Sequence, residues 1–262
     1  MSIDLSIILP AFAAGLCVLL SHIPLGKEVL NRGIIFIDLA IAQFAGLGVI
    51  LAYTLGIHAD DHWQIQLFAF SSALVGSLIL NLAEHYFKRH GAHHQEAFIG
   101  ICFVLAATAS ILLLNSNAHG GEQLKELLVG QILWTEWSQL IVPAFVGLLV
   151  FGLAWRTPSV FKGFWFYILF SLAITLSVQL VGVYLVFSSL IIPALFANLI
   201  NVKGNHTQTI VALLLGCVAY LLGLLLSSVL DLPTGAVIVW SMACLSAVVL
   251  AVFHALKGAR IG

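Results

Sequence analysis

Charged residues are scarce in this chain, and their scarcity excludes most classes of soluble protein. Asp, Glu, Lys and Arg together make up only 8% of the 262 residues, whereas an ordinary soluble domain is roughly one quarter charged. The formal net charge of −1 also excludes a nucleic-acid partner, which would require a basic footprint. Instead, the chain is 61% hydrophobic with a mean hydropathy of +1.12. These values predict a polytopic protein of the lipid bilayer, in which residues 1–262 form a single transmembrane domain.

The sequence also lacks the motifs of common catalytic sites. It contains no Gly-rich loop ending in Gly-Lys-Ser/Thr, no His-Glu-x-x-His and no Gly-x-Ser-x-Gly. We therefore expect that the chain is not an enzyme, and that any ATP hydrolysis driving transport takes place on a separate partner chain. The cysteines show no Cys-x-x-Cys spacing and are interpreted as small core residues. They are Cys17, Cys102, Cys217 and Cys244.

Long apolar runs predict an all-α bundle of about nine transmembrane helices, with eight also possible. The count is open between residues 164 and 200, because Pro193 interrupts that run. Residues 22–32 are expected to form a short amphipathic connection after the first span, since they contain Pro24, Gly26 and several charges. The predicted spans are residues 5–21, 33–52, 65–83, 97–114, 140–155, 164–181, 184–200, 210–229 and 236–254.

Basic residues fall in alternate connections, which predicts the orientation of the chain. Lys and Arg favour the cytoplasmic side of short loops. Of the ten basic residues, only Lys125 falls on the other side. We therefore expect an external N-terminus and a cytoplasmic C-terminus in a bacterial inner membrane. The nine that share one side are Lys27, Arg32, Lys88, Arg89, Arg156, Lys162, Lys203, Lys257 and Arg260.

Residues 33–52 are the run around which the others are expected to pack. About 20 residues at 1.5 Å rise cover the ~30 Å hydrocarbon core, yet this run contains Asp38 and Gln43. An ionisable group is costly there and usually faces a bundle interior or a path for solutes. Asp38 and Gln43 are therefore candidates for lining a transport path. The small residues Gly46 and Gly48 would let neighbouring helices approach closely.

Two groups of histidines and carboxylates suggest contact with metal ions outside the spans. Imidazole and carboxylate are suitable ligands for first-row divalent metals. The inner group matches no closed tetrahedral site, and we interpret it as a solvated loop, with transient metal capture as the alternative; its histidines are His85, His90, His93 and His94. The outer group is a candidate for a shallow collecting site, made of His58, Asp60, Asp61 and His62.

The only long polar connection covers residues 115–139. Leu124, Leu127 and Leu128 have helical spacing within it, which predicts a short amphipathic helix at the outer surface. This helix either packs against the bundle or forms a docking surface for an extracytoplasmic partner.

Several segments resemble one protein family. Residues 24–33 (PLGKEVLNRG), 96–101 (EAFIGI), 181–197 (VGVYLVFSSLIIPALFA) and 230–236 (LDLPTGA) are similar to segments of the permease subunits of metal-type ABC importers, the ABC-3 family. The vitamin B12 importer permease is more distantly similar. The match marks Gly182, Pro193, Asp231, Pro233 and Gly235 as structural positions.

The resemblance implies a homodimeric permease that binds an ABC ATPase subunit and receives its substrate from an extracytoplasmic metal-binding protein. The transported substrate would be a divalent metal ion, with zinc favoured and manganese or iron possible. No permanently bound cofactor is expected.

Two departures from the family keep other functions open. The family's Asp-x-x-x-His pattern corresponds to Leu39 and Gln43 here, and Asp38 lies five residues from Gln43, about 140° around a helix. This change favours a metal chelate or another solute as the alternative substrate. The cytoplasmic loop at residues 156–163 is also shorter than in the family, which favours a non-transporting subunit. Arg156, Lys162 and Lys203 are the candidates for contact with the ATPase.

Overall fold

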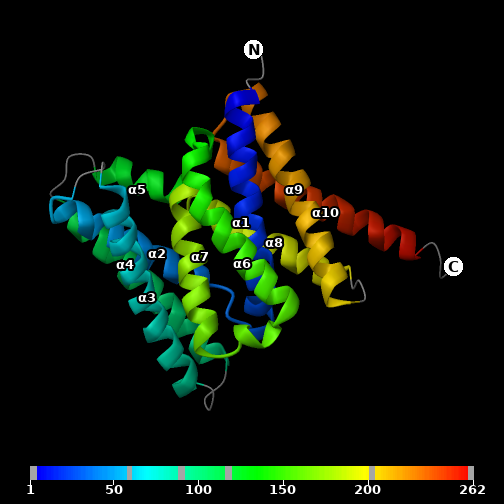
Figure 1. The fold of residues 1–262 in the computed structure, drawn as a ribbon. Helices are drawn as coiled ribbons and strands as arrows, with labels where there is room; N and C mark the ends of the chain where they lie inside the picture. Colours follow the sequence, from blue (N-terminus) through cyan, green and yellow to red (C-terminus); the bar gives the residue numbers. More distant parts are fainter. Residues whose placement is uncertain (1–4, 58–60, 88–91, 116–119, 201–203, 259–262) are drawn as a thin grey trace.

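The chain folds into a bundle of helices that cross one another at various angles (Figure 1). The computed structural model describes residues 5–57, 61–87, 92–115, 120–200 and 204–258, and no strand occurs among them. This confirms the all-α prediction. The α-helices are α1 (Leu5–Arg32), α2 (Ile37–Thr54), α3 (His62–Phe87), α4 (Ala92–Leu114), α5 (Gly120–Val129), α6 (Ile141–Arg156), α7 (Phe164–Val181), α8 (Val183–Leu199), α9 (Asn205–Leu230) and α10 (Thr234–Gly258). Three 3-10 helices join them: η1 (Ile132–Trp134), η2 (Trp137–Leu140) and η3 (Pro158–Phe161).

The number of spans agrees with the range expected from the sequence. Within the described residues, eight helices are long and apolar enough to cross a membrane, and α8 is a shorter apolar helix of 17 residues. At 1.5 Å per residue, α8 is about 26 Å long, close to the thickness of the hydrocarbon core. The break between α7 and α8 falls at Gly182, whereas Pro193 lies inside α8. The predicted spans 164–181 and 184–200 are therefore confirmed as separate helices, and Pro193, which left the count open, does not interrupt the second of them.

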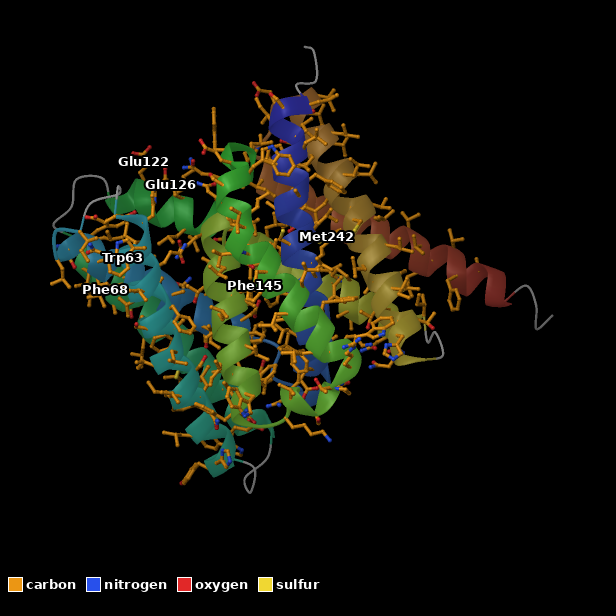
Figure 2. The ribbon with its side chains drawn as sticks, viewed as in Figure 1. Trp63, Phe68, Glu122, Glu126, Phe145 and Met242 are labelled. Atoms are coloured by element: carbon orange, nitrogen blue, oxygen red, sulfur yellow. The ribbon has the colours of Figure 1, made fainter. Side chains whose placement is uncertain are left out.

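The surface of the bundle is covered by large apolar side chains, as lipid contact requires. Leu112 is 77% exposed, Phe145 67% and Trp240 71%. Phe145 lies on the outer side of α6 (Figure 2). Patches of this extent mark membrane or protein contact rather than a water-facing surface.

Residues 22–32 do not form the connection that the sequence predicted, because α1 continues as a helix to Arg32. Close packing outweighs the helix-breaking tendency of this stretch. A Cβ on Gly26 would lie 2.0 Å from the backbone oxygen of Leu190, so α1 and α8 touch directly. The ammonium group of the buried Lys27 donates to the backbone oxygen of Asn205 at 2.8 Å and to Thr209 Oγ1 at 3.0 Å. A proline within a membrane helix is tolerated when neighbouring helices satisfy the freed backbone groups.

Arg32 joins four elements at one end of the bundle, which we call the Arg32 end. Its Nε donates to Glu28 Oε1 at 2.8 Å, and its Nη1 donates to Glu84 Oε2 on α3 at 3.3 Å. Its Nη2 donates to the backbone oxygen of Phe161 in η3. Tyr167 on α7 donates to the same Glu84 oxygen at 2.8 Å. The guanidinium group thus holds the ends of α1, α3 and η3 together, and Tyr167 joins α7 to them through the Glu84 carboxylate.

We expect Arg32→Lys to destabilise this end of the bundle. An ammonium group is a point charge and cannot reproduce the planar fork that reaches three acceptors at once. The loss should be about 1.5–3 kcal/mol, because a hydrogen bond to a charged group contributes that much. Thermal unfolding of the purified chain in detergent measures it, with Arg156→Lys at an exposed position as the matched control. Equal unfolding temperatures for both variants would contradict the assignment.

Three glycines meet at the opposite end, which we call the Gly182 end. A Cβ on Gly182 would lie 2.3 Å from the backbone nitrogen of Gly130, and one on Gly235 would lie 2.7 Å from the backbone oxygen of Val129. We call this contact the glycine junction: Gly130 follows α5, Gly182 separates α7 from α8, and Gly235 begins α10. Two of the segments that resemble the family therefore meet there. Leu127 and Leu128 of α5 pack against the core, which confirms a helix packed on the bundle.

Candidate functional site

The helix α2 is the central helix that the sequence predicted, and it packs against α3, α4, α7 and α8. It begins at Ile37 rather than at Gly33 because α1 ends in a Schellman motif. Gly33 has φ +69° and donates to Leu30 O at 3.3 Å, while Ile34 donates to Val29 O at 3.3 Å. The turn places Asp38 in the first turn of α2, at the Arg32 end. The sequence alone had placed it five residues inside the predicted span 33–52.

Asp38 is a buried carboxylate to which no described side chain donates a hydrogen bond. Its side chain is only 1% exposed, and the groups that interact with Oδ1 and Oδ2 are the backbone N–H groups of Asp38 and Leu39 in the first turn of α2. Glu96, in the second turn of α4, accepts the backbone N–H of Phe36 through Oε1 at 3.0 Å, but its Oε2 is buried and unpartnered. This hydrogen bond places Glu96 beside the residue two positions before Asp38. Two acidic groups therefore lie near each other where α2 and α4 begin.

Gln43 lies on another side of α2 from Asp38, as the spacing predicted. It is 7% exposed and shares a face with Leu39 and Gly46, which lie four residues before and three residues after it. Gly46 faces Leu127 of α5, where a Cβ would make ordinary contact at 3.5 Å. Gly48 touches α3, since a Cβ there would lie 2.4 Å from the backbone oxygen of Phe68. The prediction that these small residues admit close neighbours thus holds for Gly48.

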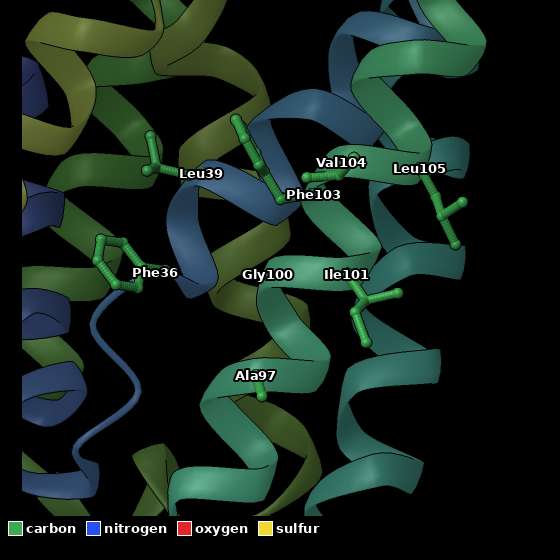
Figure 3. Close-up of a pocket in the computed structure, with 8 residues that line it drawn as sticks. All are labelled: Phe36, Leu39, Ala97, Gly100, Ile101, Phe103, Val104 and Leu105. Carbon is green, nitrogen blue, oxygen red and sulfur yellow. The ribbon is translucent and has the colours of Figure 1, made fainter.

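A cavity of about 620 Å³ lies between the start of α2 and α4. Figure 3 shows its apolar lining, which comes from α2 and the residue before it on one side and from α4 on the other. Leu39, at the position that the family resemblance gives to a metal-binding Asp, is one of the lining side chains. The full lining is Phe36, Leu39, Ala97, Gly100, Ile101, Phe103, Val104 and Leu105.

The predicted histidine sites are not assembled in the described residues. His85 is exposed and bonds through Nδ1 to the Asn81 oxygen of its own helix at 3.0 Å, and the exposed His94 ring stacks on Phe87. Asp61 and His62 lie at the start of α3. Within these residues no group of three or more His, Cys, Asp or Glu side chains could hold a metal ion. His58, Asp60 and His90 lie outside the described residues, as does the side chain of His93.

The remaining predicted residues fall at the two ends of the bundle. Arg156 ends α6 and Lys162 follows η3, both exposed at the Arg32 end, while Lys203 lies outside the described residues. At the other end, Asp231 ends α9 with a left-handed backbone (φ +53°), and the oxygen of Pro233 accepts the Val237 N–H at 3.1 Å. Pro193 is buried within α8.

Glu96 is the site residue that sequence reasoning missed. It begins one of the family-like segments, residues 96–101, and no role of its own followed from the sequence. The available signal was a single carboxylate directly before the apolar run 97–114. Its proximity to Asp38 could not be deduced, because 57 residues separate the two positions.

Comparison with known proteins places this geometry among transport proteins. The family model described as the ABC 3 transport family matches residues 4–157 and 157–254. The manganese transport system membrane protein MntC of Halalkalibacterium halodurans is 24% identical over 234 residues, covering 82% of this chain and 76% of that protein.

Two solved structures have the same fold. PsaBC from Streptococcus pneumoniae in complex with Fab gives a TM-score of 0.73 at 22% identity, covering 94% of this chain and 91% of that one. A metal-chelate type ABC transporter in an inward-facing conformation gives a TM-score of 0.61 at 20% identity, covering 94% and 84%. At these identities the structures establish the fold alone. The chain is thus a multi-pass membrane protein with the fold of ABC permeases.

Proposed function

The chain belongs to the ABC 3 transport family, and from that membership we propose that it is the membrane permease subunit of an importer for a divalent metal ion. The family match over residues 4–254 is the observation that carries the proposal. In this proposal two copies form the permease and a separate ABC ATPase supplies the work. An extracytoplasmic metal-binding protein delivers the ion.

We place the Arg32 end in the cytoplasm. Arg32, Arg156 and Lys162 lie there, whereas Glu122 and Glu126 lie exposed on α5 at the Gly182 end (Figure 2). Short loops rich in Lys and Arg remain on the cytoplasmic side. With this orientation, α5 offers its charged face to the delivery protein, while Arg156 and Lys162 are available to the ATPase.

Zinc and manganese are the two ions that we consider first. Zinc was favoured on the family resemblance, and the relative named for manganese transport supports manganese. The residues of this chain give zinc little support as the substrate, because Gln43 replaces the family's histidine and an amide is a poor zinc ligand. We propose that Asp38, in the first turn of α2, contacts the ion as it crosses the membrane.

The elemental content of metal-starved cells tests this function. Cells that lack the gene are expected to show a selective fall in one of zinc, manganese or iron, measured by mass spectrometry. The wild-type gene, restored in the same cells, should return that element to its normal level. Unchanged contents of all three metals, with the protein present and folded in the control cells, would reject the proposal.

A metal chelate is the second candidate substrate. The cavity of about 620 Å³ beside Leu39 has an apolar lining, which suits an organic ligand better than a bare ion. The fold shared with a metal-chelate type transporter is consistent with this alternative. A non-transporting subunit is the third reading, and the short loop at residues 156–163 supports it. Uptake of a labelled chelate without uptake of the free metal would favour the second candidate.

A further inference from the structure

Lys27 is a buried cation that has no carboxylate partner in the described part of the chain. Its side chain lies in α1 and is only 9% exposed. The ammonium group donates to the backbone and side-chain oxygens of Asn205 and to Thr209 Oγ1, and all three acceptors are neutral. Because a buried charge is costly unless an opposite charge balances it, the position of Lys27 calls for a negative partner.

The neighbouring carboxylate of Glu28 does not serve as this partner. Its Oε1 accepts Arg32 Nε at 2.8 Å, and Arg32 also pairs with Glu84. These are the two ion pairs among the residues that the structure describes, and neither includes Lys27. The partner of the ammonium group is therefore sought outside the chain.

A small pocket of about 80 Å³ lies beside Lys27 at the Arg32 end. Lys27 and Glu28 of α1 line its base, Trp155 of α6 lines one side, and His206 of α9 lines the other. The centroids of the Trp155 and His206 rings are 4.0 Å apart, so the end of α6 and the start of α9 lie side by side (Figure 1). The pocket is larger than one water molecule, which occupies about 30 Å³ of the liquid, and far smaller than the roughly 300–1,000 Å³ of a drug-sized site. It therefore suits a single polar group.

The start of α9 adds positive potential to the pocket. Its N-cap is Gly204, which has no side chain to accept the N–H groups of the first turn. Asn205 and His206 of that turn line the pocket. A helix N-terminus favours an anion, and its free N–H groups commonly bind phosphate. Arg156, which follows Trp155 and is exposed, brings a further positive charge to this end of the bundle.

The pocket lies where lipid headgroups are expected. Trp155 is 41% exposed and ends an α6 surface that carries exposed Phe145 and Leu148. Tryptophan is enriched at the boundary between membrane and water, so its position marks that level of the bundle. Basic pockets between transmembrane helices on the cytoplasmic side bind anionic headgroups. The pocket combines these features at the end of the bundle that we place in the cytoplasm.

We propose that this pocket binds the phosphate group of an anionic phospholipid. Lys27 acts as the counter-charge of the phosphate, and the first turn of α9 supplies N–H donors to it. The bound lipid holds the ends of α6 and α9 against α1. The site is separate from α2 and goes beyond the proposed function, because it does not depend on which substrate is transported.

Native mass spectrometry of the full-length chain, purified in detergent and titrated with lipid, tests the site by counting the lipids on each chain. We expect one phosphatidylglycerol molecule to bind more tightly than phosphatidylethanolamine, whose own ammonium group balances its phosphate. Lys27→Met and His206→Asp should each weaken this binding at least about fivefold, the usual contribution of one basic side chain near an anionic lipid. An acidic residue in the first turn favours the helix, so His206→Asp keeps the test valid if Lys27→Met does not fold. Asn115→Asp, in the exposed turn after α4, is the matched control and should bind as the wild type does.

Three outcomes would overturn the proposal. The first is phosphatidylglycerol binding of wild-type strength in folded His206→Asp protein. The second is equal binding of phosphatidylglycerol and phosphatidylethanolamine, which would indicate ordinary lipid contact with the apolar surface. The third is displacement of the lipid by an excess of inorganic phosphate, which would assign the pocket to a free anion. None of these results depends on metal uptake, so the proposed function is tested separately.

Discussion

Replacement of Asp38 by Asn is expected to abolish metal uptake while leaving the chain folded and more heat-stable than the wild type. The carboxylate is 1% exposed and has no donor among the described side chains, so its burial is costly. Its place in the first turn of α2 offsets part of that cost, because a negative charge at a helix N-terminus contributes about 0.3–2 kcal/mol. An amide of the same shape should therefore stabilise the fold by about 1–2 kcal/mol, since a buried group left unsatisfied costs ~1–3 kcal/mol.

Uptake of the metal identified in cells measures the first effect, and thermal unfolding of the purified chain measures the second. Glu136→Gln, at an exposed position where the amide oxygen can still cap η2, is the matched control and should change neither. A stabilising substitution that destroys activity is typical of a functional site rather than of a structural one. Normal uptake by well-expressed Asp38→Asn protein would exclude Asp38 from the path.

Gly182→Ala is expected to be the most destabilising of the substitutions considered for this chain. The backbone of Gly182 has φ +80° and ψ +161°, a region that is essentially restricted to glycine. The added methyl group would also lie 2.3 Å from the backbone nitrogen of Gly130, which cannot move away as a side chain could. Backbone strain of about 1–3 kcal/mol and overpacking of similar size give a loss of ~3–5 kcal/mol.

The yield of folded protein from membranes and its unfolding temperature measure this loss. Gly152→Ala is the matched control, because Gly152 is an exposed glycine of α6 with no atom within 4 Å of an added Cβ. Alanine there should be neutral or stabilise the helix by up to about 1 kcal/mol. If Gly182→Ala protein accumulates and unfolds like the control, the glycine junction does not restrict the backbone as described.

The sequence predicted the helices best where a helix-terminating glycine flanked an apolar run. Residues 164–181 match α7 at both ends because Gly163 and Gly182, with φ +72° and +80°, terminate it. The prediction was wrong for residues 22–32, where Pro24 and Gly26 suggested a connection. The contact of Gly26 with Leu190 and the hydrogen bonds of Lys27 keep that stretch helical. Both effects depend on α8 and α9, more than 150 residues away in the chain.

The sequence predicted one of the two carboxylates at the start of α2 and α4. Asp38 stood out because a carboxylate in an apolar run is rare. Its depth in the bundle depended on the turn at Gly33, which delays the start of α2 to Ile37 and so places Asp38 in the first turn of that helix. Its neighbour Glu96 comes from α4. No local pattern reports which carboxylate from another helix faces it. The histidine loops attracted attention by composition, yet their described members form no cluster.

The two contacts of α8 have a mechanical consequence. One end of this helix begins at Gly182, pressed against Gly130 beside α5, and Leu190 near its middle touches Gly26 of α1. Backbones in direct van der Waals contact leave no free space between two helices. A displacement of one helix therefore displaces the next. A force applied to α5 on one face of the membrane is therefore transmitted through α8 to α1, and along α1 to Arg32 on the other face. In this sense α8 is a rigid connection between the Gly182 end and the Arg32 end of the bundle.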